Sequence, residues 1–179
     1  MKKHISILLT GILAAALLVG CGSQDSELVS KTPFPEFDEV DTQGNAISSD
    51  IFAYYGATVI NFWSNGCGTC IEEMPELEEL YHQLQKENIN LIGVGVDSGE
   101  GEEQLATAQN ILKEKGVTYP NISPNPENAF YKEFISQITG YPTTYVVDSE
   151  GNIIGAPIIS NVKSQEDTLR QRLEQAVGK

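Results

Sequence analysis

The chain is poor in the side chains that bind metal ions. Among its 179 residues there are 3 cysteines and 2 histidines. A structural zinc site needs about four such ligands, and an iron–sulfur cluster needs about four cysteines. The sequence also contains no nucleotide-binding or flavin-binding motif. We therefore expect neither a metal nor an organic cofactor.

Basic residues are also scarce. The chain has 11 lysines and arginines against 25 aspartates and glutamates, which gives a formal net charge of −14. A surface of this charge repels the phosphate backbone of DNA and RNA. We therefore expect no nucleic acid partner.

No apolar run in the sequence is long enough to cross the full hydrocarbon core of a membrane as a helix. The longest, from Ile5 to Gly20, has 16 residues and follows Lys2 and Lys3. As a helix it would be about 24 Å long, against a hydrocarbon core of about 30 Å. A positive start followed by a short apolar run is typical of a secretory signal peptide.

The end of this run, residues 18–21 with the sequence Leu-Val-Gly-Cys, resembles the bacterial lipobox. The resemblance implies cleavage before Cys21 and acylation of that cysteine, which would anchor the protein to the outer side of the cell membrane. We therefore expect a lipoprotein signal peptide at 1–20, a polar tether at 21–32 and one domain at 33–179. A secreted protein with an incidental cysteine, or an uncleaved anchor, is the alternative.

The periodicity of apolar residues after the tether alternates between strand and helix. A strand–helix–strand–helix order followed by a hairpin and a helix predicts an α/β fold. Its central mixed sheet would carry helices on both faces, with an N-terminal β-hairpin extension. The predicted elements are a hairpin over 34–40 and 44–48, strands 57–63 and 89–96, helices 67–87 and 102–115, a loop 119–128, a helix 129–137, a hairpin over 143–148 and 152–156, and a helix 164–177.

The two remaining cysteines, Cys67 and Cys70, lie where strand 57–63 leads into a helix. The free N–H groups and the positive dipole end of a helix N-terminus favour the thiolate form of Cys67. Cys70 follows one turn later, near enough to form a disulfide with Cys67. A purely structural disulfide is the alternative, but it would close too small a loop to restrict the unfolded chain much. The strand–CxxC–helix pattern favours redox exchange.

Two stretches of sequence resemble the thioredoxin-like family of the TlpA/ResA type. The first runs from Asn-Phe-Trp at 61–63 through Cys-Gly-Thr-Cys at 67–70 to Glu-Met-Pro at 73–75. The second is Gly-Tyr-Pro-Thr-Thr-Tyr-Val-Val-Asp at 140–148. The family-like order covers nearly the whole chain after the tether, so the resemblance implies a thioredoxin-like fold.

The resemblance also implies further site residues. Pro142 matches the family's cis-proline beside the cysteine pair, and the backbone of Tyr141 would pair with an extended client segment. Gly66 and Trp63 would flank the client, although the place of Trp63 at the end of a buried strand favours packing in the core instead. Gly66 stands where the family commonly has tryptophan, and Thr69 where it commonly has proline, so both positions bear on partner choice and reduction potential.

Glu73 lies three positions after Cys70, on the same face of the predicted helix. In ResA-like proteins an acid at this position can accept or relay a proton during exchange. The alternative is a solvated glutamate in an acidic helix.

The combined features predict an extracytoplasmic thiol–disulfide oxidoreductase that reduces disulfides in exported proteins. By resemblance, the clients would be apocytochrome c or a methionine sulfoxide reductase, and the electron donor a membrane thiol carrier of the CcdA/DsbD kind. We expect a monomer. A disulfide-forming oxidase, or a binding lipoprotein with a structural Cys67–Cys70 bridge, are the alternatives. A peroxiredoxin-like peroxidase is disfavoured because its reactive cysteine usually lies in a different local pattern.

Overall fold

The structure is a computed structural model that describes residues 32–178. The predicted signal peptide, the acylated Cys21 and nearly all of the predicted tether lie outside these residues. Thr32, the last residue assigned to the tether, already pairs with Ile153 in the sheet. Within residues 32–178, no helix is both long enough and apolar enough to cross a membrane.

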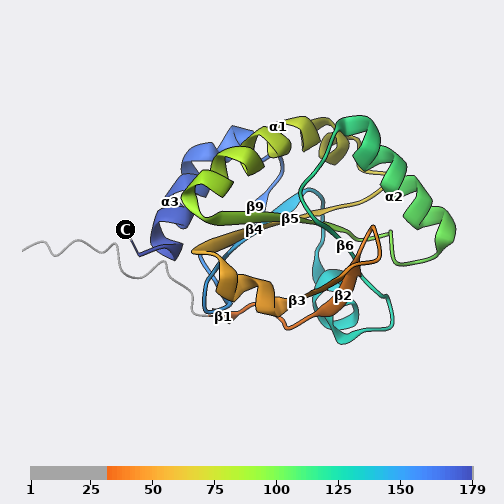
Figure 1. The fold of residues 1–179 in the computed structure, drawn as a ribbon, viewed down its shortest axis with the longest axis horizontal. Coiled ribbons are helices and arrows are strands. Elements are labelled where there is room, and N and C mark those ends of the chain that lie inside the picture. Colours follow the sequence, from red (N-terminus) through yellow and green to blue (C-terminus); the bar gives the residue numbers. More distant parts are fainter. Residues whose placement is uncertain (1–31, 179) are drawn as a thin grey trace, which may run out of the picture.

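The domain is built on a nine-stranded mixed sheet (Figure 1). The strand order is β1-β8-β7-β4-β5-β6-β2-β3, and β9 pairs with β7 beside this path. The strands are β1 (Thr32–Pro33), β2 (Asp38–Asp41), β3 (Ala46–Ser48), β4 (Ala57–Trp63), β5 (Ile89–Gly95), β6 (Asn121–Ser123), β7 (Thr143–Asp148), β8 (Asn152–Ile153) and β9 (Ile158–Ile159). The helices are η1 (Ser49–Tyr54), α1 (Gly68–Leu84), η2 (Gln85–Glu87), α2 (Glu102–Lys115), η3 (Phe130–Phe134), η4 (Ile135–Gln137), η5 (Lys163–Gln165) and α3 (Glu166–Ala176).

The two central strands, β4 and β5, pair in parallel, and β7 pairs antiparallel to β4. Every residue of β4 and β5 is buried. Such strands, covered on both faces, read as continuous apolar runs in the sequence. The predicted mixed sheet and the predicted N-terminal hairpin, formed by β2 and β3, are therefore confirmed.

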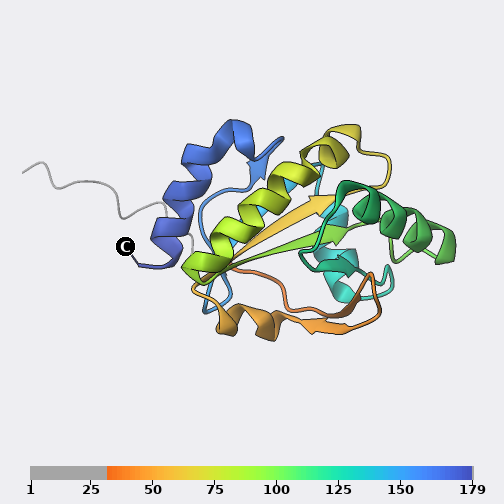
Figure 2. The ribbon, with the colours of Figure 1, turned by 45° about the horizontal axis from the view of Figure 1, so that its top comes forward.

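The three α-helices cover one face of the sheet. Figure 2 shows α1 above the central strands, with α3 on one side and α2 on the other. Leu77 and Leu84 of α1 and Leu169 and Leu173 of α3 pack with Val59 in one buried cluster. These residues supply the apolar stripes that hold both helices on the sheet.

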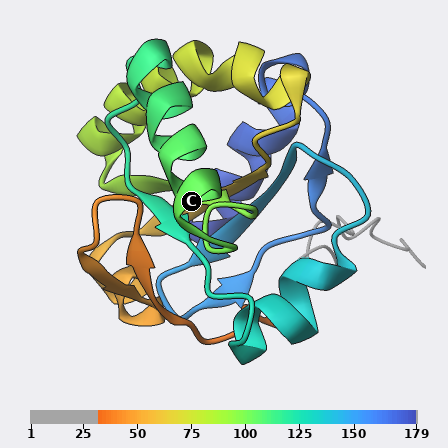
Figure 3. The ribbon, with the colours of Figure 1, turned by 90° about the vertical axis from the view of Figure 1, so that its right-hand side faces the viewer.

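The opposite face carries short helical turns (Figure 3). The buried cluster on this face is rich in aromatic rings. Phe34 meets Phe52 edge to face, which is a favourable arrangement of aromatic rings. Phe130 meets both Phe34 and Phe62 at tilted angles. The helix predicted at 129–137 is a π turn and a 3₁₀ turn, η3 and η4. The prediction of helices on both faces of the sheet is therefore confirmed, although the helices on this face are short turns.

One strand lies inside the predicted loop at 119–128. β6 pairs in parallel with β5 and antiparallel with β2. Its three residues are all buried, although two of them, Asn121 and Ser123, are polar. The prediction of an unpaired loop is therefore wrong here, because neighbouring strands far away in the sequence impose the extended backbone.

The edges of the sheet are formed by very short strands. β1 and β9 have two residues each, and β3 has three. Each therefore exposes only a few backbone hydrogen-bonding groups at the border of the sheet.

Candidate active site

The cysteine pair lies at the start of α1, and the two sulfurs form a disulfide of 2.01 Å. Cys67 is the N-cap residue, and its sulfur accepts a hydrogen bond from the backbone N–H of Cys70 at 3.2 Å. This geometry places Cys67 where the helix N-terminus stabilises negative charge on sulfur. Cys67 is half-buried, whereas Cys70 is only 1% exposed. A partner arriving from solvent therefore meets Cys67 first.

The loop that delivers Cys67 is held by the β5–α2 connection. The backbone N–H of Asn65 donates to the Asp97 carboxylate at 2.7 Å. The Asn65 side chain donates to the Gln104 side chain and backbone, both at 3.0 Å. No local pattern in the sequence shows that Asp97 anchors a loop 32 positions away.

The Tyr141–Pro142 peptide bond is cis, as predicted. Pro142 precedes β7, whose first residue, Thr143, lies opposite Phe62 near the end of β4. This register brings the proline to the edge of the sheet from which Cys67 also emerges. The carbonyl of Pro142 accepts a hydrogen bond from the N–H of Ser160 at 2.9 Å.

The side chain of Tyr141 packs against the buried cluster that contains Trp63, Cys70 and Met74. Its backbone N–H and C=O make no hydrogen bond to any other residue within 32–178. Burial raises the pKa of the Tyr141 hydroxyl, and the nearby Tyr131 and Asp97 raise it further. The Tyr141 backbone is therefore left with hydrogen-bonding capacity beside the cysteine pair.

Glu73 is buried, with 2% of its surface exposed. One carboxylate oxygen accepts from the Asn61 side chain at 3.2 Å, and the other accepts from the backbone N–H of Val162 at 3.0 Å. Burial raises the pKa of this carboxyl, while the hydrogen bonds from Val162 and Asn61 lower it, and the charge of Glu76 raises it again. Burial has the largest effect, so the pKa is raised overall. The alternative of a solvated surface glutamate is wrong.

Asn61, which belongs to the motif at 61–63, links three elements of the fold. Besides Glu73 on α1, its side chain donates to the Thr144 hydroxyl on β7 at 3.0 Å. The sequence signal is an amide side chain inside the buried run of β4, because buried polar groups need partners. No sequence signal indicates that the amide of Val162 completes the site.

Two of the predicted client-contacting residues differ in exposure. Trp63 is 0% exposed and donates from its ring nitrogen to Asn121 at 2.9 Å. The prediction that Trp63 contacts a client is therefore wrong, because the ring lies inside the core beneath the site. Gly66 is exposed, and a side chain there would meet nothing within 4 Å. Its contact with a client stays a prediction.

A half-exposed cysteine at a helix N-cap, its buried partner one turn on and a neighbouring cis-proline in a thioredoxin-like fold together define a thiol–disulfide oxidoreductase. Residues 31–156, which include all of these features, match the AhpC/TSA family. The chain belongs to this family.

Comparison with known proteins shows which type of thiol–disulfide oxidoreductase the chain resembles. The chain is 26% identical over 175 residues to the thiol-disulfide oxidoreductase ResA of Geobacillus thermodenitrificans, covering 97% of this chain and 93% of the relative. It is 25% identical over 150 residues to ResA of Bacillus cereus, covering 84% and 82%. These relatives are named as oxidoreductases and not as peroxidases, and the predicted ResA/TlpA type is confirmed.

Solved structures agree with this assignment. A thiol:disulfide interchange protein of Chlorobium tepidum superposes with a TM-score of 0.63 at 27% identity, over 83% of this chain and 97% of that one. The thioredoxin domain of an oxidoreductase from Bacteroides vulgatus has a TM-score of 0.65 at 20% identity, over 82% and 99%. The second likeness shows the thioredoxin-like fold alone.

Proposed function

We propose that the chain is a lipid-anchored, extracytoplasmic reductant of disulfides in exported proteins. The observation that carries the proposal is the asymmetry of the cysteine pair, with Cys67 half-buried at the helix N-cap and Cys70 only 1% exposed. An accessible thiolate can attack a client, whereas a protected thiol one turn away can act only on Cys67.

The exchange has two steps. The Cys67 thiolate attacks a client disulfide, which forms a mixed disulfide and releases one client sulfur as a thiolate. Cys70 then loses its proton and attacks the Cys67 sulfur. The Cys67–Cys70 bond forms, the bond to the client breaks, and the second client sulfur leaves as a thiolate. Two electrons pass from the cysteine pair to the client, so the redox-active disulfide takes the place of a cofactor.

Glu73 supplies the base for the second step. Its carboxylate is one helical turn beyond Cys70, and its raised pKa brings it nearer to that of a thiol. The client itself would be held as an extended segment by the backbone of Tyr141 beside Pro142, with Gly66 exposed on the same border of the site.

The location and the partners rest on the sequence. The apolar run 5–20 and Cys21 support export and anchoring at the outer face of the bacterial cell membrane. An anchored reductant needs electrons from within the cell, and a membrane thiol carrier of the CcdA/DsbD kind would supply them. Apocytochrome c or an exported methionine sulfoxide reductase would be the client, and the protein would act as a monomer.

The reduction potential of Cys67–Cys70 tests the proposed direction. We would equilibrate the full chain, in mild detergent, with dithiothreitol and glutathione buffers. A potential below about −220 mV supports a reductant, whereas a value near −120 mV assigns a disulfide-forming oxidase. A pair that resists strong dithiothreitol would leave a binding lipoprotein with a structural bridge. A Cys67→Ser variant should lose all turnover of a disulfide substrate.

A further inference from the structure

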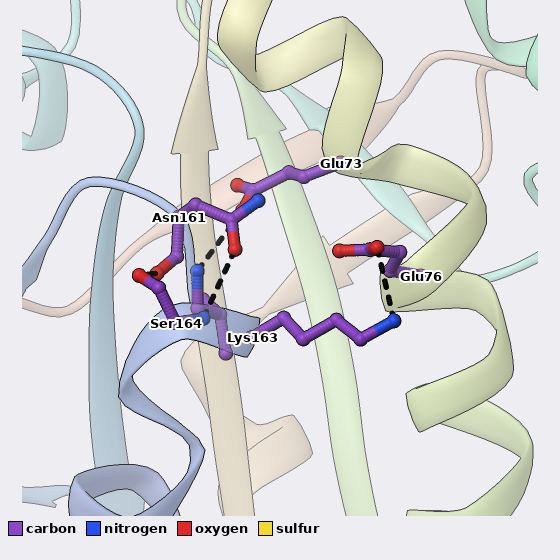
Figure 4. Close-up of polar contacts among 6 residues, drawn as sticks. Glu73, Glu76, Asn161, Lys163 and Ser164 are labelled. Atoms are coloured by element: carbon purple, nitrogen blue, oxygen red, sulfur yellow. Dashed lines mark hydrogen bonds and ion pairs between the residues drawn. The ribbon is translucent and has the colours of Figure 1, made fainter.

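A groove of about 90 Å³ lies between α1 and the segment that leads from β9 into α3. Figure 4 shows Glu73 and Glu76 of α1 facing Asn161, Lys163 and Ser164 of that segment. The lining combines carboxylates such as Glu73 and Glu76 with apolar side chains such as Leu80 and Leu169. A space of this size beside charged groups has room for several water molecules.

The groove leads away from the cysteine pair. Its lining residues on α1 begin at Glu73 and end at Gln83, all beyond Cys70 in the helix. Glu76 is six residues past Cys70, roughly 9 Å further along the helix axis. Glu73, which is 2% exposed, therefore borders a groove that runs along α1 away from the end where a client would reach Cys67.

The mouth of the groove carries an ion pair. Lys163 donates to the Glu76 carboxylate at 3.0 Å, with side chains 61% and 40% exposed. The same segment contacts the site at two other points, because Ser160 donates to the carbonyl of Pro142 and Val162 donates to Glu73. Two hydrogen bonds fix the shape of this segment. The backbone N–H of Ser164 donates to the Asn161 side chain, and the Ser164 hydroxyl donates to the Asn161 carbonyl.

We propose that Glu73 exchanges its proton with solvent through this groove, and that Glu76 and Lys163 are positioning residues whose opposite charges set how readily it does so. The inference rests on the proposed function, because it assigns an exit to the proton that Glu73 takes from Cys70. Glu73 binds the Cys70 proton as Cys70 attacks, and the carboxyl then releases it to groove water. The client thiolates take their protons from solvent on the other side.

The charged groups around Glu73 come from four elements. Glu76 and Glu79 lie on α1, Lys163 on η5 and Glu166 on α3. Tyr119, in the segment before β6, is buried, and the charge of Glu73 helps to raise the pKa of its hydroxyl. Lys163 is the single cation among these groups. Removing it should therefore disfavour the ionised form of Glu73, whereas removing Glu76 should favour it.

The two partners of the ion pair therefore make opposite predictions. Glu76→Gln should move the acidic limb of the pH profile for the Cys70 step to lower pH, and Lys163→Met should move it to higher pH. Each shift should be roughly 0.3 on the pH scale, as expected for one charge near a protein surface. If the Lys163–Glu76 ion pair had only a structural role, either substitution would break it. Both pH profiles would then move in the same direction.

The step is measured by forming the mixed disulfide between the full chain, in detergent, and a cysteine peptide, and following release of the peptide from pH 4 to pH 9. Leu80→Trp adds bulk to the groove without charge, and should lower the plateau rate several-fold. Because it also excludes water from Glu73, it should move the midpoint to higher pH. The exposed ion pair between Lys132 of η3 and Glu127, which precedes η3, offers matched controls. Glu127→Gln and Lys132→Met should move neither quantity.

Each outcome is decisive. Midpoints that stay in place or move together would overturn the role of Glu76 and Lys163, and an unchanged plateau in folded Leu80→Trp would overturn the groove as the route. Failure of the wild-type chain to release any peptide would instead overturn the proposed function. Circular dichroism of each variant establishes that it is folded.

Discussion

Val162 and Glu73 are 89 positions apart in the sequence, yet the amide of the first donates to the carboxylate of the second at 3.0 Å in the interior. The contact joins the segment before α3 to the helix that carries the cysteines. Since the hydrogen bond is to a buried charge, it is worth more than an ordinary one. The chemistry of α1 is thereby tied to the C-terminal part of the chain.

Replacing Glu73 should change how stability depends on pH. Burial raises the folded-state pKa of Glu73 above its unfolded value of about 4.3. The folded state then binds more protons than the unfolded state between these two values, so stability falls as the pH rises through this window. The free energy of unfolding of wild type minus that of Glu73→Gln should be largest in acid and should decline as the pH rises.

Urea unfolding at a series of pH values measures this difference. A difference between wild type and Glu73→Gln that is independent of pH would contradict the raised pKa.

Asn61→Ala should destabilise the protein by about 2–3 kcal/mol, because it leaves the buried carboxylate of Glu73 with one donor fewer. It should also raise the pKa of Glu73 further. Thr144→Val removes only the hydroxyl that Asn61 contacts on its other side, and should cost about 1 kcal/mol. Equal losses from the two variants in urea unfolding would contradict the central position of Asn61.

In the reduced protein, Cys67 should react with iodoacetamide roughly tenfold or more faster than Cys70, because it is accessible and lies at the helix N-cap. Mass spectrometry of peptides from partly alkylated protein measures the ratio. In cells, Cys70→Ser should accumulate covalent complexes with clients, and Cys67→Ser should not. Equal alkylation of the two thiols would contradict the assigned roles.

Two glycines near the site should respond in opposite ways to substitution. A Cβ at Gly66 would meet no atom within 4 Å, so Gly66→Trp should change stability by less than about 0.5 kcal/mol. A Cβ at Gly99 would lie 1.8 Å from the carbonyl oxygen of Pro124. Gly99→Ala should therefore cost about 2–4 kcal/mol. Thermal unfolding of both variants checks this, and a neutral Gly99→Ala would refute it.

The sequence was sufficient for the elements whose signals are local. Strand 57–63 and helix 102–115 were predicted at the bounds observed for β4 and α2. An apolar run rich in β-branched residues specifies the first, and a glycine in the left-handed region, Gly116 with φ of 71°, ends the second. The cysteine pair and the cis-proline were likewise found from short motifs.

Features that depend on distant partners could not be read in this way. The strand at Asn121–Ser123 exists because β5 and β2 lie on either side of it. The hydrogen bond from Val162 to Glu73 comes from a backbone amide, which every residue except proline has. Trp63 was placed beside the client by analogy, whereas its partner Asn121 fixes the ring in the core. In each case the deciding contact joins segments far apart in the chain.

The short border strands affect how copies of this protein meet one another. Within residues 32–178, a neighbouring chain that extended the sheet would find two residues to pair with at β1 or β9, and three at β3. So short a ladder of backbone hydrogen bonds stabilises edge-to-edge association only weakly. The net charge of −14 opposes the approach as well. Both features oppose the association of copies of this protein when its local concentration is high.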